Sequence, residues 1–141
     1  MEQIIRELSE EMSKRIESQR NWVKDHYTSD AIEKYETVDG KLELLDKIIK
    51  ANWIQRTETL KLQCLGVTLG DVLVQELKFR WIEIEDEYGI DPAIKLEETS
   101  IILFPLTMIS KRIEKSENID IYELYKLLKD SIEEIKKKII E

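Results

Sequence analysis

The chain has 141 residues, of which 42% are hydrophobic and 37% are charged, and its formal net charge is −8. This composition predicts one soluble domain, residues 1–141, that buries a core without needing disulfide bonds. It disfavours nucleic acid and anionic membranes as partners, because both reward clustered lysine and arginine.

Three further features favour a reducing, cytoplasmic location. Cys64 is the only cysteine, so no internal disulfide can form. The N-terminus contains no basic segment followed by an apolar one, so a signal peptide is not expected. The apolar run Ile101–Leu106 is too short to cross a bilayer.

The first residues predict a long helix followed by a short one. Apolar residues spaced three or four apart predict an amphipathic helix over residues 2–25, with Ile5, Leu8, Met12, Ile16 and Val23 on its buried face. Ser29 or Asp30 is suited to cap a second helix over residues 31–36.

Two more helices are predicted before the middle of the chain. Residues 37–40 read as a turn. The apolar positions from Leu42 onward predict a third helix that ends near residues 51–53. Thr57 is suited to cap a fourth helix, which runs to about Leu77.

Three short strands are predicted next. Residues 79–87 are rich in β-branched and aromatic side chains and alternate apolar residues with acids. Residues 88–92 predict a turn, and residues 93–96 and 100–104 predict two further strands. Together they predict a small antiparallel meander with one solvated, acidic face.

The last part of the chain predicts two helices. Pro105 suits the first position of a helix that runs to about Glu117. Asp120 is placed to cap the final helix, with Glu123 at the capping-box spacing. We therefore expect an α+β fold, with helices packed on one face of a small, mostly antiparallel three-stranded sheet.

Two glycines in the fourth predicted helix point to close packing. Gly66 and Gly70 lie four residues apart and therefore face the same side of the helix. A phosphate-binding loop is the functional alternative, but the pattern matches neither a P-loop nor a dinucleotide fingerprint. Close approach of another helix or of the sheet is the favoured interpretation, because glycine in a helix otherwise costs about 1 kcal/mol.

The densest acidic cluster supplies the candidate partner-binding residues: Glu83, Glu85, Asp86, Glu87 and Asp91. Residues 80–100 hold seven acidic and two basic side chains, a local charge of −5. A guard against sheet aggregation, a docking face for a basic protein and a metal site all remain open. The spacing is not that of a calcium-binding EF-hand loop, and neither a metal nor a cofactor is predicted.

No catalytic residue is predicted. His26 is the only histidine, and a nucleophilic pair with Cys64 would lack any recognisable motif around either residue. A helix-end or loop position for His26 and a buried apolar role for Cys64 are favoured. The three tryptophans are expected to pack in the core or at helix ends, although an apolar ligand pocket near Trp81 stays open.

A combined pattern lies between Leu65 and Arg112. It consists of Leu65-Gly66, Gly70-Asp71, Trp81, Asp86-Glu87-Tyr88-Gly89, Ile102 through Pro105, Met108-Ile109 and Lys111-Arg112. On this pattern the chain resembles a family of small bacterial domains of unknown function. The resemblance implies a small bacterial α+β domain, and it carries over no catalytic or ligand-binding residue.

We therefore expect a non-enzymatic protein-interaction domain of the bacterial cytoplasm, a monomer or homodimer, with a protein partner for which a basic protein is one candidate. Some small acidic bacterial proteins of similar architecture act as immunity proteins, which inhibit toxins. The comparison with this chain is one of general architecture and not of a shared motif. Two alternatives stay open. One is a small hydrolase or metal-binding enzyme that uses residues 83–91 with His26, and the other is a small-ligand sensor.

Overall fold

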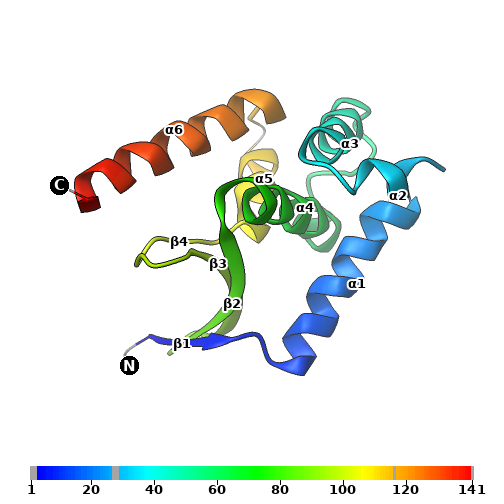
Figure 1. Cartoon of the computed structure of the whole chain (residues 1–141). Helices are drawn as coiled ribbons and strands as arrows, with labels where there is room; N and C mark the ends of the chain where they lie inside the picture. The colour runs from blue at the N-terminus through cyan, green and yellow to red at the C-terminus, as the bar shows by residue number, and fades with distance from the viewer. Residues whose placement is uncertain (1–2, 27–28, 116, 141) are drawn as a thin grey trace.

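The structure is a computed structural model that describes residues 3–26, 29–115 and 117–140. Within these ranges the predicted α+β class is confirmed, with helices packed against an antiparallel sheet (Figure 1), although the sheet has four strands rather than three. The described elements are β1 (Ile4–Glu7), α1 (Glu10–His26), α2 (Ala31–Lys34), α3 (Val38–Lys50), α4 (Thr59–Leu77), β2 (Phe79–Asp86), β3 (Gly89–Leu96), β4 (Ile102–Leu103), α5 (Leu106–Glu114) and α6 (Ile121–Ile140).

The additional strand, β1, was predicted as the start of the first helix, over residues 2–25. In the structure β1 is an edge strand in the order β1-β2-β3-β4, and Ile4 pairs with Glu85 of β2. The prediction failed at Ser9, whose hydroxyl accepts the N–H of Met12 at 3.1 Å and so caps α1. The residues before this cap are free to extend and pair with β2.

Strands β2 and β3 form a hairpin with a turn of two residues, Glu87 and Tyr88. The Asp86 carboxylate accepts the Tyr88 N–H at 2.8 Å, and Gly89 adopts a φ of 127° that favours glycine. The predicted turn over residues 88–92 is therefore too long. Pro92 lies inside β3, where it is tolerated because β4 pairs only with the two residues Ile94 and Lys95 further along that strand.

Two further helix starts, those of α3 and α6, are fixed by side-chain caps. The Thr37 hydroxyl accepts the Gly40 N–H at 2.9 Å, so α3 begins at Val38. The turn predicted over residues 37–40 is instead the first turn of this helix. The Asp120 carboxylate accepts the N–H groups two and three residues further on, at 2.9 and 3.2 Å, which confirms the predicted cap of α6.

The starts of α2 and α4, like that of α5, have no side-chain cap. Asp30 precedes α2 and Glu58 precedes α4, and neither side chain accepts a cap hydrogen bond. Helix α4 therefore begins just beyond the cap predicted at Thr57. Its stability comes from burial, since most of its central residues are inaccessible to solvent.

The helices lie on one side of the sheet, as Figure 1 shows, with α4 at the centre of the helical layer. Phe79 of β2 and Leu96 of β3 pack with Leu73 of α4 and Ile132 of α6. Three residues that alternate with them along the strands form a separate small cluster: Ile82, Ile84 and Ala93. In the described part of the chain, no helix is both long enough and apolar enough to cross a membrane.

Candidate functional site

The predicted acidic face is divided by the structure into a buried part and an exposed part. Glu83 is only 3% exposed, so it is not a solvated surface acid. Its carboxylate accepts the backbone N–H of Ser9 at 2.8 Å and lies 3.4 Å from the Arg6 guanidinium. Arg6 also donates to the half-buried Glu85 at 2.8 Å. These two acids therefore hold β1 and the start of α1 against β2.

The ionisation of Glu83 should make the free energy of unfolding depend on pH in acidic solution. The Ser9 N–H, assisted by Arg6, holds the pKa of Glu83 below its ordinary value. Its stabilising effect is complete above the unfolded-state pKa of about 4.3 and is lost as the pH falls through the lowered folded-state value. Urea melts from pH 7 downward should show a smaller acid-induced loss of unfolding free energy in Glu83→Gln than in the wild type. Glu87→Gln serves as an exposed control on the same hairpin, and equal acid slopes in the wild type and Glu83→Gln would contradict the assignment.

The exposed part of the acidic segment is the end of the β2–β3 hairpin. Glu87 and Asp91 are both exposed, and between them Tyr88 has 87% of its surface accessible. Ile4 of β1 and Ile90 of β3 are each 44% exposed and flank Glu85 in one row across the three strands. We call Ile4, Glu85, Asp86, Glu87, Tyr88, Ile90 and Asp91 the hairpin surface.

The sequence pattern indicates the acidic residues of the hairpin surface but not its apolar side chains. The sequence places Tyr88 only in a predicted turn, and Ile4 only within the predicted first helix. The exposed aromatic residue beside Gly89 was the available signal, because a two-residue turn presents its side chains to solvent. Ile4 gave no such signal, since its pairing with β2 depends on a residue far along the chain.

A second polar cluster, which the sequence did not predict, surrounds Asp71 of α4. The Arg20 guanidinium of α1 donates two hydrogen bonds to the Asp71 carboxylate, at 2.7 and 2.9 Å. The Trp81 indole N–H of β2 donates to it at 3.0 Å, and the Tyr35 hydroxyl donates as well. Asp71 is 8% exposed, so all four hydrogen bonds are shielded from solvent. The cluster ties α1, the end of α2 and β2 to α4.

Charge and burial around Asp71 indicate a structural cluster. The hydrogen bond to Asp71 raises the pKa of Arg20, which is always charged. Burial, with the Asp71 charge, raises the pKa of Tyr35 well above its ordinary value, so its hydroxyl stays protonated as a donor. Burial lowers the pKa of Lys41, whose ammonium lies 5.2 Å from the centre of the Tyr35 ring and donates to Gln75. Four donors occupy the Asp71 oxygens, which leaves them little capacity to act as a general base.

At each of the two helical glycines another element lies too close to α4 to leave room for a side chain. A Cβ at Gly66 would lie 2.5 Å from the Leu106 Cα, at the start of α5. A Cβ at Gly70 would lie 2.6 Å from the Trp81 ring and 2.9 Å from the Pro105 ring. The packing interpretation is thus supported by geometry, and the same contacts bring the Trp81 indole within reach of Asp71.

Other candidate residues lie apart from one another. Cys64 is 7% exposed within the main core, and burial raises the pKa of its thiol to about 11, so the thiolate form is scarce at neutral pH. The side chain of His26 lies outside the described residues. A depression of about 350 Å³ lies beside Trp81, but four of its eight lining residues are charged, so it is not the apolar pocket considered above. Among the described side chains, no group of three or more His, Cys, Asp or Glu residues is placed to hold a metal ion.

These features define a class of small α+β domain, in which a helical layer is tied to an antiparallel sheet through Asp71 and the helical glycines. The chain belongs to the family described as Domain of unknown function (DUF3806), whose model matches residues 41–125. The resemblance seen in the sequence is thereby confirmed. Gly66, Gly70, Asp71 and Trp81 lie in the matched segment, as does the β2–β3 hairpin.

One solved structure has a similar fold. It is a crystal structure from Bacteroides thetaiotaomicron, with a TM-score of 0.76 and 15% sequence identity over 93% of this chain. The match covers 48% of the other chain, so the present chain spans about half of that protein's length. A search of curated proteins gives no significant match. At this level of identity the likeness concerns the fold alone.

Proposed function

We propose that this protein is a non-enzymatic interaction domain that binds a basic protein partner through the hairpin surface. The observation that carries the proposal is Tyr88, which is 87% exposed on a two-residue turn between the exposed acids Glu87 and Asp91. Tyrosine is enriched at the centres of protein interfaces, because its ring buries a large area at a small entropic cost.

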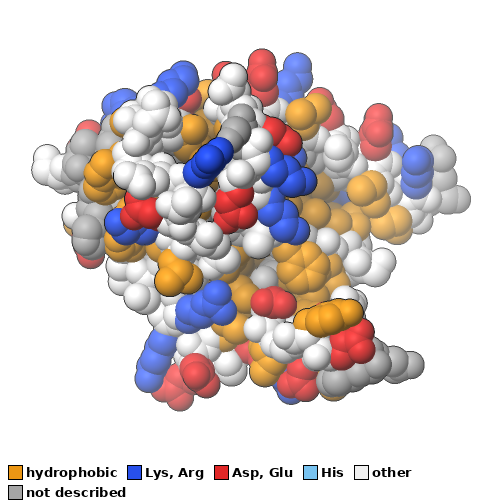
Figure 2. Space-filling view, turned by 180° about the vertical axis from the view of Figure 1, so that it is seen from behind, with side chains coloured by type: hydrophobic (Ala, Val, Ile, Leu, Met, Phe, Trp, Pro, Cys, Tyr) orange, Lys and Arg blue, Asp and Glu red, His pale blue; other side chains and the backbone are white. Residues whose placement is uncertain are grey.

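The surroundings of Tyr88 give the partner's expected character. Ile4 and Ile90 add exposed apolar area, and the acids at the hairpin end give this area a negative border. In Figure 2, hydrophobic and acidic side chains lie side by side over the sheet end, at the lower right of the molecule. A partner with an apolar patch bordered by lysine or arginine would complement this surface, and charge would steer its approach.

The proposal includes a narrower form, an immunity-type inhibitor that neutralises a basic toxin. It rests on the same surface and on the overall charge of −8. A small acidic protein that covers a basic active site needs no catalytic residues of its own, which fits the structural role of the buried Asp71 cluster.

Charge reversal at the hairpin end should slow association without unfolding the protein. We expect Glu87→Lys/Asp91→Lys to lower the yield of specific partners in pull-downs from the native host, and the association rate of a captured partner to fall about tenfold or more at low salt. Tyr88→Ala should mainly raise the dissociation rate, because it removes the anchor. Glu83 is left unchanged, since its reversal would disturb the β1–α1 junction.

The matched control is Glu133→Lys/Glu134→Lys, which makes the same charge change at exposed positions on α6. This control should capture the same partners at the wild-type level. Equal yields from the wild type, the hairpin variant and the Tyr88→Ala variant would rule out the hairpin surface as the docking site.

A further inference from the structure

The strand β1 is an open edge of the sheet. Among the described strands it pairs with β2 on one side and with none on the other, and in Figure 1 it runs along the lower margin of the molecule. All four of its residues are exposed. In an antiparallel pair every second residue directs its N–H and C=O away from the neighbouring strand, so β1 presents backbone donors and acceptors that another strand can use.

The side chains of β1 do little to guard this edge. Exposed edge strands are commonly protected by lysine, proline or a bulge. β1 contains neither lysine nor proline, and its four residues pair in continuous register with β2. Its one cation, Arg6, is turned onto β2, where the guanidinium lies 2.8 Å from Glu85 and 3.4 Å from Glu83. The edge is therefore short, but it is open to another strand.

Apolar side chains on both faces of the sheet reach this edge. On the side of the helices, Ile4 is the last residue of the row that begins at Ile90. On the other side, Ile5 is 47% exposed and pairs with Ile84, which is 2% exposed. An added strand with apolar residues opposite Ile4 and Ile5 would cover both. The other edge strand, β4, has only two residues and offers no such rows.

Charge indicates which kind of strand would fit. The Glu7 side chain is 86% exposed, although Arg80 lies 3.6 Å from its carboxylate. A strand antiparallel to β1 runs in the same direction as β2 and so ends beside the hairpin end, where Glu87 is exposed. Basic residues at both ends of such a strand would therefore meet acids. A second copy fits less well, because two chains of net charge −8 repel each other.

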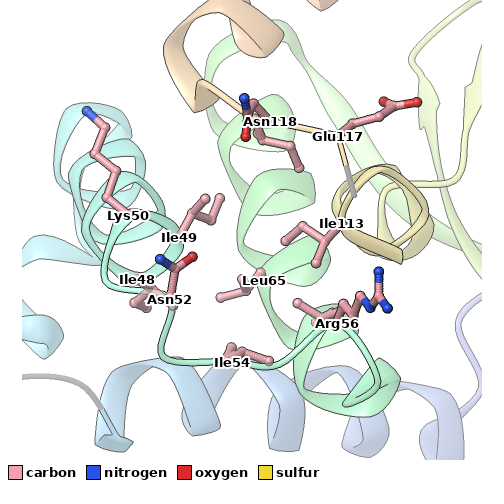
Figure 3. A pocket seen from close by; sticks show the side chains of 12 residues that line it. Ile48, Ile49, Lys50, Asn52, Ile54, Arg56, Leu65, Ile113, Glu117 and Asn118 are labelled. Atoms are coloured by element: carbon pink, nitrogen blue, oxygen red, sulfur yellow. The ribbon is translucent and has the colours of Figure 1, made fainter. Parts of the chain in front are cut away.

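A hollow between α3, α4 and α5 offers no comparable complementarity. Its volume is about 450 Å³ and Leu65 lies in its apolar floor. In Figure 3 Asn52 and Asn118 lie on different sides of the hollow, and the Arg56 guanidinium points away from it. The polar groups there do not converge on one ligand group, whereas the hydrogen-bonding groups and side chains of β1 all lie along one edge.

From these observations we propose that β1 is a docking edge, to which an extended basic segment of the protein partner adds as a fifth, antiparallel strand. Backbone hydrogen bonds would give affinity and the alternating side chains would give specificity. The expected segment has a basic residue opposite Glu7, two apolar residues opposite Ile5 and Ile4, and further basic residues that reach the acids of the hairpin end. This inference rests on the proposed function, since it states how the basic partner of the hairpin surface binds.

The first test is a titration of the ¹⁵N-labelled protein at low salt with the peptide acetyl-Lys-Thr-Val-Val-Lys-Lys-amide, followed by NMR. The peptide can place its first lysine opposite Glu7 and its two valines opposite Ile5 and Ile4. We expect saturable shifts of the backbone amides of residues 4–7, slower hydrogen exchange at alternate residues of β1, and contacts between Hα protons of the peptide and of β1. The absence of saturable changes at residues 4–7 overturns the proposal.

Two altered peptides separate backbone pairing from charge attraction. N-methylation of the threonine and of the first valine blocks both edges of the peptide and keeps its charge, because adjacent residues of a strand direct their N–H groups to opposite sides. It should weaken binding about tenfold or more. Replacing the three lysines by glutamates should weaken binding by a similar factor at low salt. Equal binding of the parent and N-methylated peptides would mean attraction without strand addition, and would overturn the proposal.

A variant of the edge tests the same contact from the protein's side. Ile5→Lys lies outside the hairpin surface, and it replaces an apolar contact by a cation that repels the basic peptide. We expect about tenfold weaker peptide binding. Ile32→Lys makes the same change on α2, at a side chain that is 58% exposed, and should leave binding unchanged. Circular dichroism identifies a variant that fails to fold, and equal peptide binding by the two folded variants would contradict the docking edge.

The outcomes distinguish this inference from the proposed function. Full partner capture by Ile5→Lys, with capture lost in Glu87→Lys/Asp91→Lys, would overturn strand addition and leave the hairpin surface in place. Peptide pairing with β1, with equal partner capture by the wild type and the hairpin variants, would support the docking edge and rule out the hairpin surface. If β1 amide exchange slows with protein concentration alone, the edge belongs to a second copy and the proposal is overturned.

Discussion

Replacing Asp71 by asparagine is expected to lower the free energy of unfolding by about 3–5 kcal/mol, the usual cost of breaking a buried ion pair by removing one partner. The carboxylate accepts two hydrogen bonds from Arg20 and one each from Tyr35 and Trp81. An asparagine offers one acceptor oxygen, and its NH₂ group would face donors instead. Arg20 would also lose its buried countercharge, although its pair with the exposed Glu17 would remain.

Urea denaturation followed by both tryptophan fluorescence and circular dichroism measures this effect. Tyr35→Phe, which removes a single donor, should cost less, about 1–2 kcal/mol. Asp46→Asn is the matched control, because it makes the same chemical change in a pair whose lysine, Lys50, is exposed, and it should cost under about 1 kcal/mol. If Asp71→Asn lies within about 1 kcal/mol of the wild type, the buried cluster does not hold these elements together.

The fold class followed from local patterns, but the Asp71 cluster did not. Apolar spacing and cap residues indicated most helices, and alternation indicated the hairpin strands. The partners of Asp71 lie 51 residues away at Arg20 and 36 away at Tyr35, and no local spacing joins them. The same limit explains β1, whose pairing with residues near 85 overrode an apolar spacing that also suits a helix.

The hairpin surface was predicted in part for a similar reason. Acid density is visible in the sequence, so Glu87 and Asp91 were correctly placed near the end of a strand pair. The sequence does not show which acids are buried. Glu83 is buried, unlike Glu87 and Asp91, because β1 and the start of α1 lie against it and the Ser9 N–H donates to its carboxylate. A run of acids therefore indicated where charge gathers, while the tertiary contacts decided which of the acids face solvent.

The spacing of Gly66 and Gly70 predicted close packing against α4 from the sequence alone. This packing gives the second large effect that we expect on the free energy of unfolding. Gly66→Ala should lower the free energy of unfolding by about 1–3 kcal/mol, the usual range for overpacking. At an exposed helical position the same change would raise stability by about 1 kcal/mol, so the sign of the effect is diagnostic. The cause is the added Cβ, which would lie 2.5 Å from both the Leu106 Cα and the Pro105 carbonyl oxygen. These are backbone atoms, so α5 itself would have to move.

Gly70→Ala tests the same junction through a side chain. Its Cβ would meet the Trp81 ring at 2.6 Å, and a shift of that ring would strain the indole hydrogen bond to Asp71. A double variant with Trp81→Phe, which lacks the indole N–H, should therefore cost less than the sum of the two single changes. Leu60→Ala, at a position of α4 that is 74% exposed, is the control and should be nearly neutral. Chemical melts in which Gly66→Ala is as stable as the wild type, or more stable, would show that α4 and α5 are not in such close contact.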